Sequence, residues 1–483
     1  MDYSIVMTIL GKLLILESIL MTPSLIIALY TKGEDVRAFL ITIGLTLALG
    51  LGLSRLKKVR EDDITVKEGL AIVSYGWIIL SLFGALPLYI SKGTPTYIDA
   101  FFETVSGFTT TGATVIEGVE KLAQGVMFWR SFTHWIGGMG ILVFTISLLP
   151  ALGIGGFQIF KAESPGPVAG KIAPKIKDTA KILYTIYFSI TVVQVILLLF
   201  GGMNLFDSLV YTFGTVGTGG LATKSASVGF YKSNYIHIVI GVFMVLSGVN
   251  FSLYYSIFKG RWEEARDDEE LKLYLLIIGL AVAGISINLL RTSYNSIGLA
   301  LKDSFFQVGS IITTTGYSTT DFDLWPSFSK AILFLLMFIG GCAGSTAGGS
   351  KVIRVLVLLK LIKREILKIF HPRAIRPIKI NGKIMSDETI ESINAFMSLY
   401  IIIVFLSTIL VTLERVDLVT AASSVAATLG NIGPGFNIVG PASSFASYSL
   451  PAKFYFSVLM LLGRLELFTM IALLVPTKWS KIN

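Results

Sequence analysis

The chain alternates long apolar stretches with short polar connections, and this alternation predicts helices that cross a membrane. Ten stretches approach or exceed the ~20 apolar residues that a bilayer-spanning helix needs. They cover residues 5–30, 38–54, 70–90, 126–150, 182–203, 236–258, 273–290, 328–343, 393–413 and 454–475. Because the first stretch is long and another follows at once, no cleaved signal peptide is expected. The pattern predicts an all-α integral membrane protein with ten transmembrane helices.

Shorter apolar segments lie between some of these spans, and each begins with an aspartate and ends in a glycine turn. DAFFETVSGFTTTGA begins at Asp99 and DSFFQVGSIITTTGY at Asp303, and a glycine follows each aspartate by thirteen positions. The same spacing leads from Asp207, in DSLVYTFGTVGTGGL, to Gly220. A repeated spacing of this kind indicates copies of one structural unit.

A fourth copy begins at Asp417 and leaves two glycines open as its turn. Gly430 follows the aspartate by thirteen positions and fits the strict spacing, whereas Gly433 follows it by sixteen and allows one extra helical turn. Each copy is preceded by one apolar span and followed by another. The sequence therefore predicts a pseudo-fourfold repeat of span, short helix, glycine turn and span around a central pore.

The chemistry of this unit suits a cation. Aspartate at the start of a short helix is a favourable N-cap, and about a dozen residues are too few to cross the bilayer. Irregular backbone at membrane depth is tolerated only inside protein or beside water, so the glycine turns are expected to face a cavity. Four such turns would present carbonyl and threonine oxygens to a dehydrated cation, together with the negative ends of the helix dipoles. For any single copy, a plain surface loop is an equal alternative.

Composition and charge agree with a membrane protein. The chain is 53% hydrophobic and 15% charged, against about 25% charged residues in soluble domains. The net charge of +9 lies in short connections, which favours topogenic charge over nucleic-acid binding. By the positive-inside rule these connections and both termini are cytoplasmic. The positive groups are Lys57, Lys58 and Arg60; Lys161, Lys171, Lys175, Lys177 and Lys181; and eight Lys or Arg residues between 360 and 383.

The sequence offers no catalytic constellation, so no enzyme activity is expected. Its single cysteine, Cys342, excludes an internal disulfide framework. The three histidines, His134, His237 and His371, lie far apart and are interpreted as structural rather than as metal ligands. There is no GxxxxGK[ST] motif between a strand and a helix, so this chain is not expected to bind a nucleotide.

The repeated unit, the turns TTTGA and TTTGY, the segment TVGTGGLAT at 215–223 and GNIGPGF at 430–436 resemble the Trk/Ktr/HKT superfamily of potassium transporters. Two additional spans before the first repeat are similar to the Trk branch. The resemblance implies two extra N-terminal helices and four pore repeats. Their expected ranges are 1–62 for the extra helices and 63–152, 175–260, 268–370 and 386–478 for the repeats.

In this superfamily each pore loop supplies one glycine to a potassium filter. The resemblance assigns Gly112, Gly220 and Gly316, and its GNIG pattern favours Gly433 over Gly430. The implied filter comprises Thr110, Thr111 and Gly112; Thr218, Gly219 and Gly220; Thr314, Thr315 and Gly316; and Asn431, Ile432 and Gly433. Sodium-favouring members carry serine at the first filter position, so Gly112 favours potassium as the transported ion.

An arginine lies well inside the last apolar stretch, in LLGRLELF. Arg464 would be costly facing lipid, so it is expected to face a polar interior. The resemblance implies that it projects into the pore below the filter, as a barrier to cations. The alternative is that it pairs with Glu466 or reaches an interface.

Residues 340–350, GGCAGSTAGGS, interrupt an apolar run with five glycines, too many for a stable helix. A broken helix at membrane depth again indicates a cavity. The resemblance implies an intramembrane gate below the filter, and the alternative is a small-residue helix contact. The implied gate residues are Gly340, Gly341, Gly344, Ser345, Gly348, Gly349 and Lys351, the last of which is expected to help hold the loop closed.

Together these features predict potassium uptake across the inner membrane through a channel-like pore. The resemblance implies a homodimer and a cytoplasmic ring of nucleotide-binding regulatory subunits similar to TrkA. The basic stretch 363–383 is expected to contact that ring or anionic lipid. A secondary transporter coupled to sodium or protons is the main alternative, and it would want ionisable residues at mid-membrane. A membrane-embedded enzyme and a subunit with an inactive pore are weaker alternatives.

Overall fold

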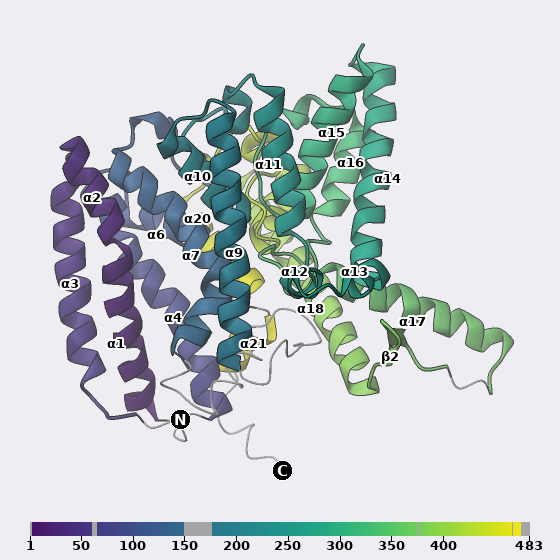
Figure 1. Ribbon diagram of the computed structural model, residues 1–483, viewed down its shortest axis with the longest axis horizontal. Coiled ribbons are helices and arrows are strands. Elements are labelled where there is room, and N and C mark those ends of the chain that lie inside the picture. Colours follow the sequence, from purple (N-terminus) through teal and green to yellow (C-terminus); the bar gives the residue numbers. More distant parts are fainter. Residues whose placement is uncertain (1, 60–64, 149–175, 374–375, 466, 475–483) are drawn as a thin grey trace.

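The computed structural model describes residues 2–59, 65–148, 176–373, 376–465 and 467–474, and helices dominate these parts of the chain (Figure 1). The first group is α1 (Tyr3–Leu20), α2 (Thr22–Thr31), α3 (Val36–Ser54), α4 (Val66–Gly84), α5 (Leu86–Ile90), α6 (Tyr97–Phe108) and α7 (Gln124–Leu148). The second is α9 (Ile176–Phe200), α10 (Leu205–Val216), α11 (Asn234–Ser247), α12 (Phe251–Phe258), α13 (Trp262–Asp267), α14 (Glu269–Thr292), α15 (Ile297–Ile312), α16 (Ser327–Leu336) and α17 (Val352–Phe370). The last is α18 (Asp387–Val411), α19 (Leu418–Leu429), α20 (Leu450–Arg464) and α21 (Leu467–Leu474).

One small β-hairpin departs from the all-α expectation. Its strands are β1 (Lys379–Ile380) and β2 (Lys383–Ile384), paired antiparallel with Lys379 opposite Ile384. Asn381 and Gly382 make the turn with φ of 47° and 76°, as an Asn-Gly hairpin turn requires. The connections also contain short 3-10 turns at Val119–Lys121, Ser227–Phe230, Phe322–Leu324, Thr412–Glu414, Asn437–Val439 and Phe445–Ser447.

Large apolar side chains cover the outside of the helical body as well as its core. Ile26, Leu280, Phe405 and Ile409 are each at least 60% exposed. A soluble monomer rarely leaves so much contiguous apolar surface in water. The exposed faces therefore suit contact with lipid tails.

Six helices among the described residues are long and apolar enough to cross a membrane, or seven if one bent pair is counted as a span. The six are Tyr3–Thr31, Val36–Ser54, Lys67–Ile90, Lys181–Phe200, Glu269–Thr292 and Asp387–Glu414. The bent pair is α11 and α12, which meet at 94°. The expected span at 328–343 coincides with α16, which already ends at Leu336. The count of ten spans stays a prediction.

The N-terminal helices pack closely onto the rest of the body. α1 contacts α3 and α4, and Figure 1 shows the three side by side. A Cβ on Gly11 would lie 2.5 Å from the backbone nitrogen of Ser54, and one on Gly50 would lie 2.9 Å from the carbonyl oxygen of Gly11. Small residues thus let the backbones of α1 and α3 approach, as is common between membrane helices.

The short helices that precede the glycine turns are α6, α10, α15 and α19. We expected the repeated aspartates to be their N-caps, and for three of the four this is wrong. Thr96 caps α6 by accepting from Asp99 N at 3.1 Å, and Asn204 caps α10 by accepting from Asp207 N at 2.8 Å. Asp303 lies inside α15, which begins at Ile297.

Only Asp417 is a cap, accepting from the backbone of Val419 and Thr420 at 2.9 and 3.0 Å. This difference explains the irregular fourth spacing. The caps Thr96, Asn204 and Asp417 each precede Gly112, Gly220 and Gly433 by the same sixteen positions. The common spacing is therefore measured from the cap, and the fourth aspartate occupies the cap itself.

Two of the aspartates that are not caps, Asp99 and Asp207, tie the starts of their helices to neighbouring segments. Asp99 forms an ion pair with Lys453 of α20 at 2.8 Å, with both side chains buried. Asp207 accepts from Thr223 at 2.7 Å and Tyr231 at 2.6 Å, both on the limb that returns after the turn. A buried carboxylate needs such partners, so these contacts fix each helix relative to its neighbours.

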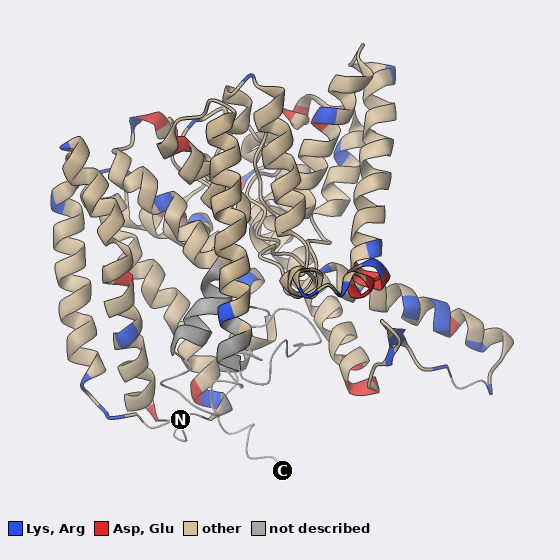
Figure 2. Ribbon diagram, in the orientation of Figure 1, with Lys and Arg blue, Asp and Glu red and all other residues tan. Residues whose placement is uncertain are grey.

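Charged residues gather at the two ends of the helical body and along α17 (Figure 2). The connection that follows α3, with Lys57 and Lys58, lies at the same end as α17 and the β-hairpin. Of the predicted positive groups, Arg60, Lys161, Lys171 and Lys175 lie outside the described residues.

Candidate functional site

The ends of α6, α10, α15 and α19 share one backbone geometry. In each, the third residue after the helix donates its N–H back to a carbonyl oxygen of the last turn, at 2.7 to 2.9 Å. The four donors are Thr111, Gly219, Thr315 and Ile432, and their acceptors are Ser106, Gly214, Ser310 and Ala427. The residue before each donor is left-handed, with φ between 53° and 56° at Thr110, Thr218, Thr314 and Asn431. Such a left-handed residue satisfies the free carbonyls at a helix end.

The residue that follows each donor is a glycine with positive φ. The values are 79° at Gly112, 76° at Gly220, 83° at Gly316 and 101° at Gly433. Gly430 has a φ of −79° and is instead the first residue after α19, the place that Thr109 occupies after α6. In backbone geometry Gly433, rather than Gly430, corresponds to the other three glycines.

The four glycine turns (residues 109–112, 217–220, 313–316 and 430–433) contact one another in a closed order. A Cβ on Gly112 would lie 2.0 Å from the carbonyl oxygen of Gly219, in the second turn. A Cβ on Gly220 would lie 1.9 Å from the oxygen of Thr315, in the third. These distances leave no room for any side chain at either glycine.

The same order continues through the remaining turns. A Cβ on Gly316 would lie 2.2 Å from the carbonyl oxygen of Ile432, and one on Gly433 would lie 2.7 Å from that of Thr111. The fourth turn thus contacts the first. Four carbonyl oxygens, from Thr111, Gly219, Thr315 and Ile432, are thus each placed against the glycine of a neighbouring turn.

Threonine hydroxyls form hydrogen bonds within the turns and between two of them. Thr111 Oγ1 contacts Thr109 Oγ1 at 2.7 Å and accepts from Asn431 Nδ2 at 2.9 Å, which links the first turn to the fourth. Thr315 Oγ1 contacts Thr313 Oγ1 at 2.8 Å. Every threonine of the predicted filter is fully buried. These hydroxyls therefore stabilise the turns.

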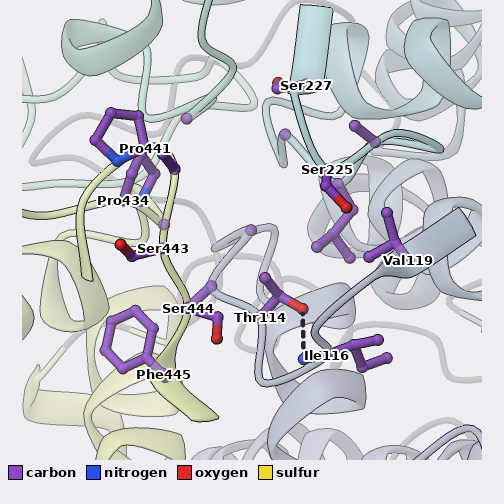
Figure 3. Close-up of a pocket in the computed structure, with 18 of the residues that line it drawn as sticks. Thr114, Ile116, Val119, Ser225, Ser227, Pro434, Pro441, Ser443, Ser444 and Phe445 are labelled. Carbon is purple, nitrogen blue, oxygen red and sulfur yellow. Dashed lines mark hydrogen bonds between the residues drawn. The ribbon is translucent and has the colours of Figure 1, made fainter. Parts of the chain in front are cut away.

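A cavity of about 530 Å³ lies against the glycine turns. All four glycines line it, together with the segments that follow the turns. Figure 3 shows Thr114 and Ile116 from the first of these segments, Ser225 and Ser227 from the second and Pro434 and Pro441 from the fourth. Its charged lining residues are Glu117, Arg130 and Lys224. The cavity is therefore bounded by the four glycine turns and by a mixture of polar and apolar residues.

A non-helical segment between α16 and α17 also contacts the glycine turns. It comprises residues 337–351 and is here called the glycine-rich loop. All seven predicted gate residues lie in it, and Gly340, Gly344, Gly349 and Lys351 have φ between 73° and 84°. Gly348 N donates to Thr314 Oγ1 at 2.7 Å, so the loop reaches the third turn directly.

Further hydrogen bonds place this loop against the C-terminal ends of α10 and α11. Thr346 Oγ1 bonds the carbonyl oxygens of Val216 at 3.0 Å and Ser247 at 3.2 Å. Lys351 Nζ donates to the carbonyl oxygen of Ala347, within the loop itself. Lys351 also has φ of 75°, a conformation that costs a non-glycine residue about 1–2 kcal/mol. The loop is thus held in one irregular shape by contacts with its surroundings.

Arg464, at the end of α20, is 5% exposed. Its guanidinium donates from Nη1 to the carbonyl oxygen of Thr346 and from Nη2 to that of Gly137 on α7, both at 2.9 Å. The arginine therefore joins the glycine-rich loop to α7. Glu466, the alternative partner considered from the sequence, lies outside the described residues.

Two of the three histidines are buried, and His371 is exposed. His134 is buried on α7, where a Cβ on Gly219 would lie 2.0 Å from its Nδ1. His237 Nε2 lies 2.7 Å from the carbonyl oxygen of Tyr231. Within the described part of the chain, no group of three or more His, Cys, Asp or Glu residues is arranged to hold a metal ion.

Comparison with known proteins agrees with the resemblance to the Trk branch. The TrkH family model, described as a cation transport protein, matches residues 36–480. This chain belongs to the TrkH family. The Trk system potassium uptake protein TrkH of Escherichia coli is 38% identical over 490 residues, with 100% of each chain covered. The Trk system potassium uptake protein TrkG of the same organism is 34% identical over 472 residues, with 97% of each covered.

A solved structure is also similar. The potassium transporter TrkH from Vibrio parahaemolyticus matches with a TM-score of 0.89 at 35% identity, over 99% of this chain and 100% of that one. TrkH-family membership identifies the chain as a multi-pass membrane transport protein. The predicted resemblance to the Trk branch is confirmed.

The structure of this chain contains a buried ion pair that sequence reasoning missed. Glu103 on α6 and Arg130 on α7 are 1% and 3% exposed and pair with each other. Glu103 also accepts from Thr114 Oγ1 at 2.9 Å and Val115 N at 3.0 Å, just after the first glycine turn. Arg130 reaches the carbonyl oxygen of Ala222, after the second turn, at 3.3 Å. The signals in the sequence were a carboxylate within a short apolar segment and an arginine within the apolar stretch 126–150.

Replacing Glu103 with alanine is expected to destabilise the protein by about 3–5 kcal/mol, because it leaves Arg130 buried without its carboxylate. Thermal unfolding of the purified protein in detergent measures the effect. Glu117→Ala is the matched control, since Glu117 lines the cavity that Arg130 also lines but is exposed. Equal unfolding temperatures for the two variants would contradict the assigned role of the pair.

Proposed function

We propose that this chain carries potassium across the cell's inner membrane through a channel-like pore, whose filter is formed by the four glycine turns. The observation that carries the proposal is the closed order of contacts from Gly112 through Gly220 and Gly316 to Gly433. Rings of backbone carbonyls replace the water that a cation sheds. The C-terminal ends of four short helices add negative potential at the same place.

Potassium is the favoured ion for two reasons. The similar proteins of Escherichia coli and Vibrio parahaemolyticus are named as potassium uptake proteins or potassium transporters. The first turn has glycine at position 112, where sodium-favouring relatives in the wider superfamily carry serine. The filter oxygens come from the twelve residues 110–112, 218–220, 314–316 and 431–433, and no nucleotide binds to this chain.

The proposed pore consists of ten transmembrane helices in pseudo-fourfold arrangement. Residues 1–62 add two helices, and repeats 63–152, 175–260, 268–370 and 386–478 surround the axis. Both termini are cytoplasmic, on the side of α17 and the β-hairpin. The equal spacing from helix cap to filter glycine in three repeats supports this division.

Flow through the pore is controlled from the cytoplasm. The glycine-rich loop and Arg464 form the gate and the barrier below the filter, supported by the hydrogen bonds of Gly348 and Arg464. The protein is a homodimer that works with a ring of TrkA-like nucleotide-binding subunits. The basic surface of α17 and the hairpin, which Figure 2 displays, is the proposed contact for that ring.

The test is potassium uptake by bacteria that lack their own uptake systems, with and without a TrkA-like partner. We expect growth at low potassium to be restored, and more strongly with the partner present. Failure of the well-expressed protein to restore uptake under either condition would overturn the proposed function.

One observation favours a second candidate, a transporter coupled to protons. Glu17 lies in the first span at 1% exposure, and neither carboxylate oxygen has a hydrogen-bond partner among the described residues. An ionised carboxylate without a partner is costly at this depth, so the group is expected to carry a proton. Glu17→Gln would abolish uptake driven by a proton gradient in a coupled transporter and leave uptake unchanged in a channel.

A further inference from the structure

A single carboxylate joins the middle of the glycine-rich loop to the start of α17. Glu270 lies in the first turn of α14 and is 6% exposed. Its Oε1 accepts hydrogen bonds from Ala343 N at 2.7 Å and Ile353 N at 3.0 Å. Ala343 lies in the loop and Ile353 in the first turn of α17. Glu270 therefore satisfies a free backbone N–H at the start of α17 while holding the loop beside it.

These two hydrogen bonds fix the base of the loop segment whose tip lies at the glycine turns. Thr346, between the two bonded positions, accepts from Arg464, and Gly348 donates to Thr314. Shifting Ala343 away from Ile353 would pull on both contacts. The carboxylate is thus placed to control whether the segment stays beneath the turns.

The residues just before Glu270 hold the cytoplasmic hairpin. Asn381 Nδ2 donates to Asp268 Oδ2 at 2.7 Å, and Asn381 Oδ1 accepts from Glu269 N at 2.9 Å. Lys360 Nζ pairs with Glu269 and donates to the carbonyl oxygen of Lys379 at 2.6 Å. Three consecutive residues at the start of α14 therefore contact the hairpin on one side and the glycine-rich loop on the other.

We infer that Glu270 is a positioning residue that clamps the glycine-rich loop closed, and that the hairpin stabilises this clamp through Asn381. The inference rests on the proposed function, because it assigns the loop as the gate. A cytoplasmic partner that displaces the hairpin would loosen the start of α14 and release the loop. Movement of the exposed hairpin would thereby be transmitted through the start of α14 to the buried loop.

The chain carries its own reporter for this test. Cys342 is the single cysteine in the sequence, precedes Ala343 and is 1% exposed. Its reaction with N-ethylmaleimide in the purified full-length protein requires the loop to open. Glu270→Ala should speed labelling by roughly tenfold or more, because each hydrogen bond to a charged group is worth about that factor.

Three further variants sharpen the result. Glu270→Gln keeps an acceptor oxygen and should label at nearly the wild-type rate. Asn381→Gly keeps the positive-φ turn, loses both hydrogen bonds to α14 and should label at an intermediate rate. Glu263→Ala, at an exposed position on α13, is the control and should match wild type.

Wild-type labelling of Glu270→Ala, or equally fast labelling of the glutamine and alanine variants, would overturn the clamp. If the alanine variant does not purify as a single folded species, Asn381→Gly carries the test, and its labelling at the wild-type rate would overturn the inference.

Uptake without the partner, measured in parallel, separates this inference from the proposed function. Faster labelling with greater uptake supports both. Faster labelling in a protein that carries no potassium supports the clamp and contradicts the transport function, whereas faster labelling without greater uptake overturns the loop's role as gate.

Discussion

Replacing Gly316 with serine is expected to lower the preference for potassium over sodium by about tenfold or more. The new Cβ would lie 2.2 Å from the carbonyl oxygen of Ile432 and 2.8 Å from Cδ of Pro434. Gly316 also has φ of 83°, which costs a residue with a side chain about 1–2 kcal/mol. The fourth turn must therefore move outward, and the displaced carbonyl no longer matches its three neighbours. A shift of 1.4 kcal/mol in relative ion binding already changes selectivity by about tenfold.

The ratio of potassium to sodium flux measures this effect. Gly118→Ser is the matched control, because Gly118 has φ of 72° and lines the same cavity, yet a Cβ there would meet only the end of Lys121 at 3.7 Å. The control experiences the same backbone strain without touching the ring. Loss of selectivity in both variants would assign the effect to strain near the pore and contradict the assigned filter.

Replacing Arg464 with alanine is expected to raise uptake by roughly tenfold in the absence of a regulatory partner. The change removes two charge-assisted hydrogen bonds, to Thr346 of the glycine-rich loop and to Gly137 of α7. It also removes a buried positive charge from the proposed pathway, where cations are repelled more strongly than in water. Initial rates of uptake in cells lacking other potassium systems give the measurement.

Arg464→Lys separates these two causes. Lysine keeps the positive charge but lacks the planar guanidinium group, which can donate to two carbonyl oxygens at once. If the positive charge forms the barrier, the lysine variant should take up potassium as slowly as the wild type. If the hydrogen bonds to the loop and to α7 form the barrier, it should take up potassium as fast as the alanine variant. Unchanged uptake in both folded variants would remove Arg464 from the pathway.

The sequence predicted the repeated turns because their chemistry is local. The left-handed residues Thr110 and Thr314 and the glycines two positions later all lie within the four-residue motif TTTG. The role of the repeated aspartates was misjudged, because Thr96 and Asn204, three residues earlier, are equally good caps. Measuring from the cap also removes the ambiguity in spacing between Gly430 and Gly433.

Contacts between distant segments could not be predicted in the same way. Glu270 lies 73 and 83 residues before the two backbone groups that it binds, and no periodicity connects them. Glu103 and Arg130 are 27 residues apart on different helices. The bend of 94° between α11 and α12 likewise interrupts an apolar run that reads as one continuous span. Such features depend on how helices assemble, which local patterns do not encode.

The most direct test of the central claim is tracer rubidium flux into liposomes that contain only the purified protein. We expect flux that external potassium blocks, while the same concentration of sodium leaves it nearly unchanged, because four carbonyl-bearing turns replace the water of the larger ion. Equal block by sodium and potassium, or no flux from protein shown to be folded, would contradict a potassium pathway through these turns.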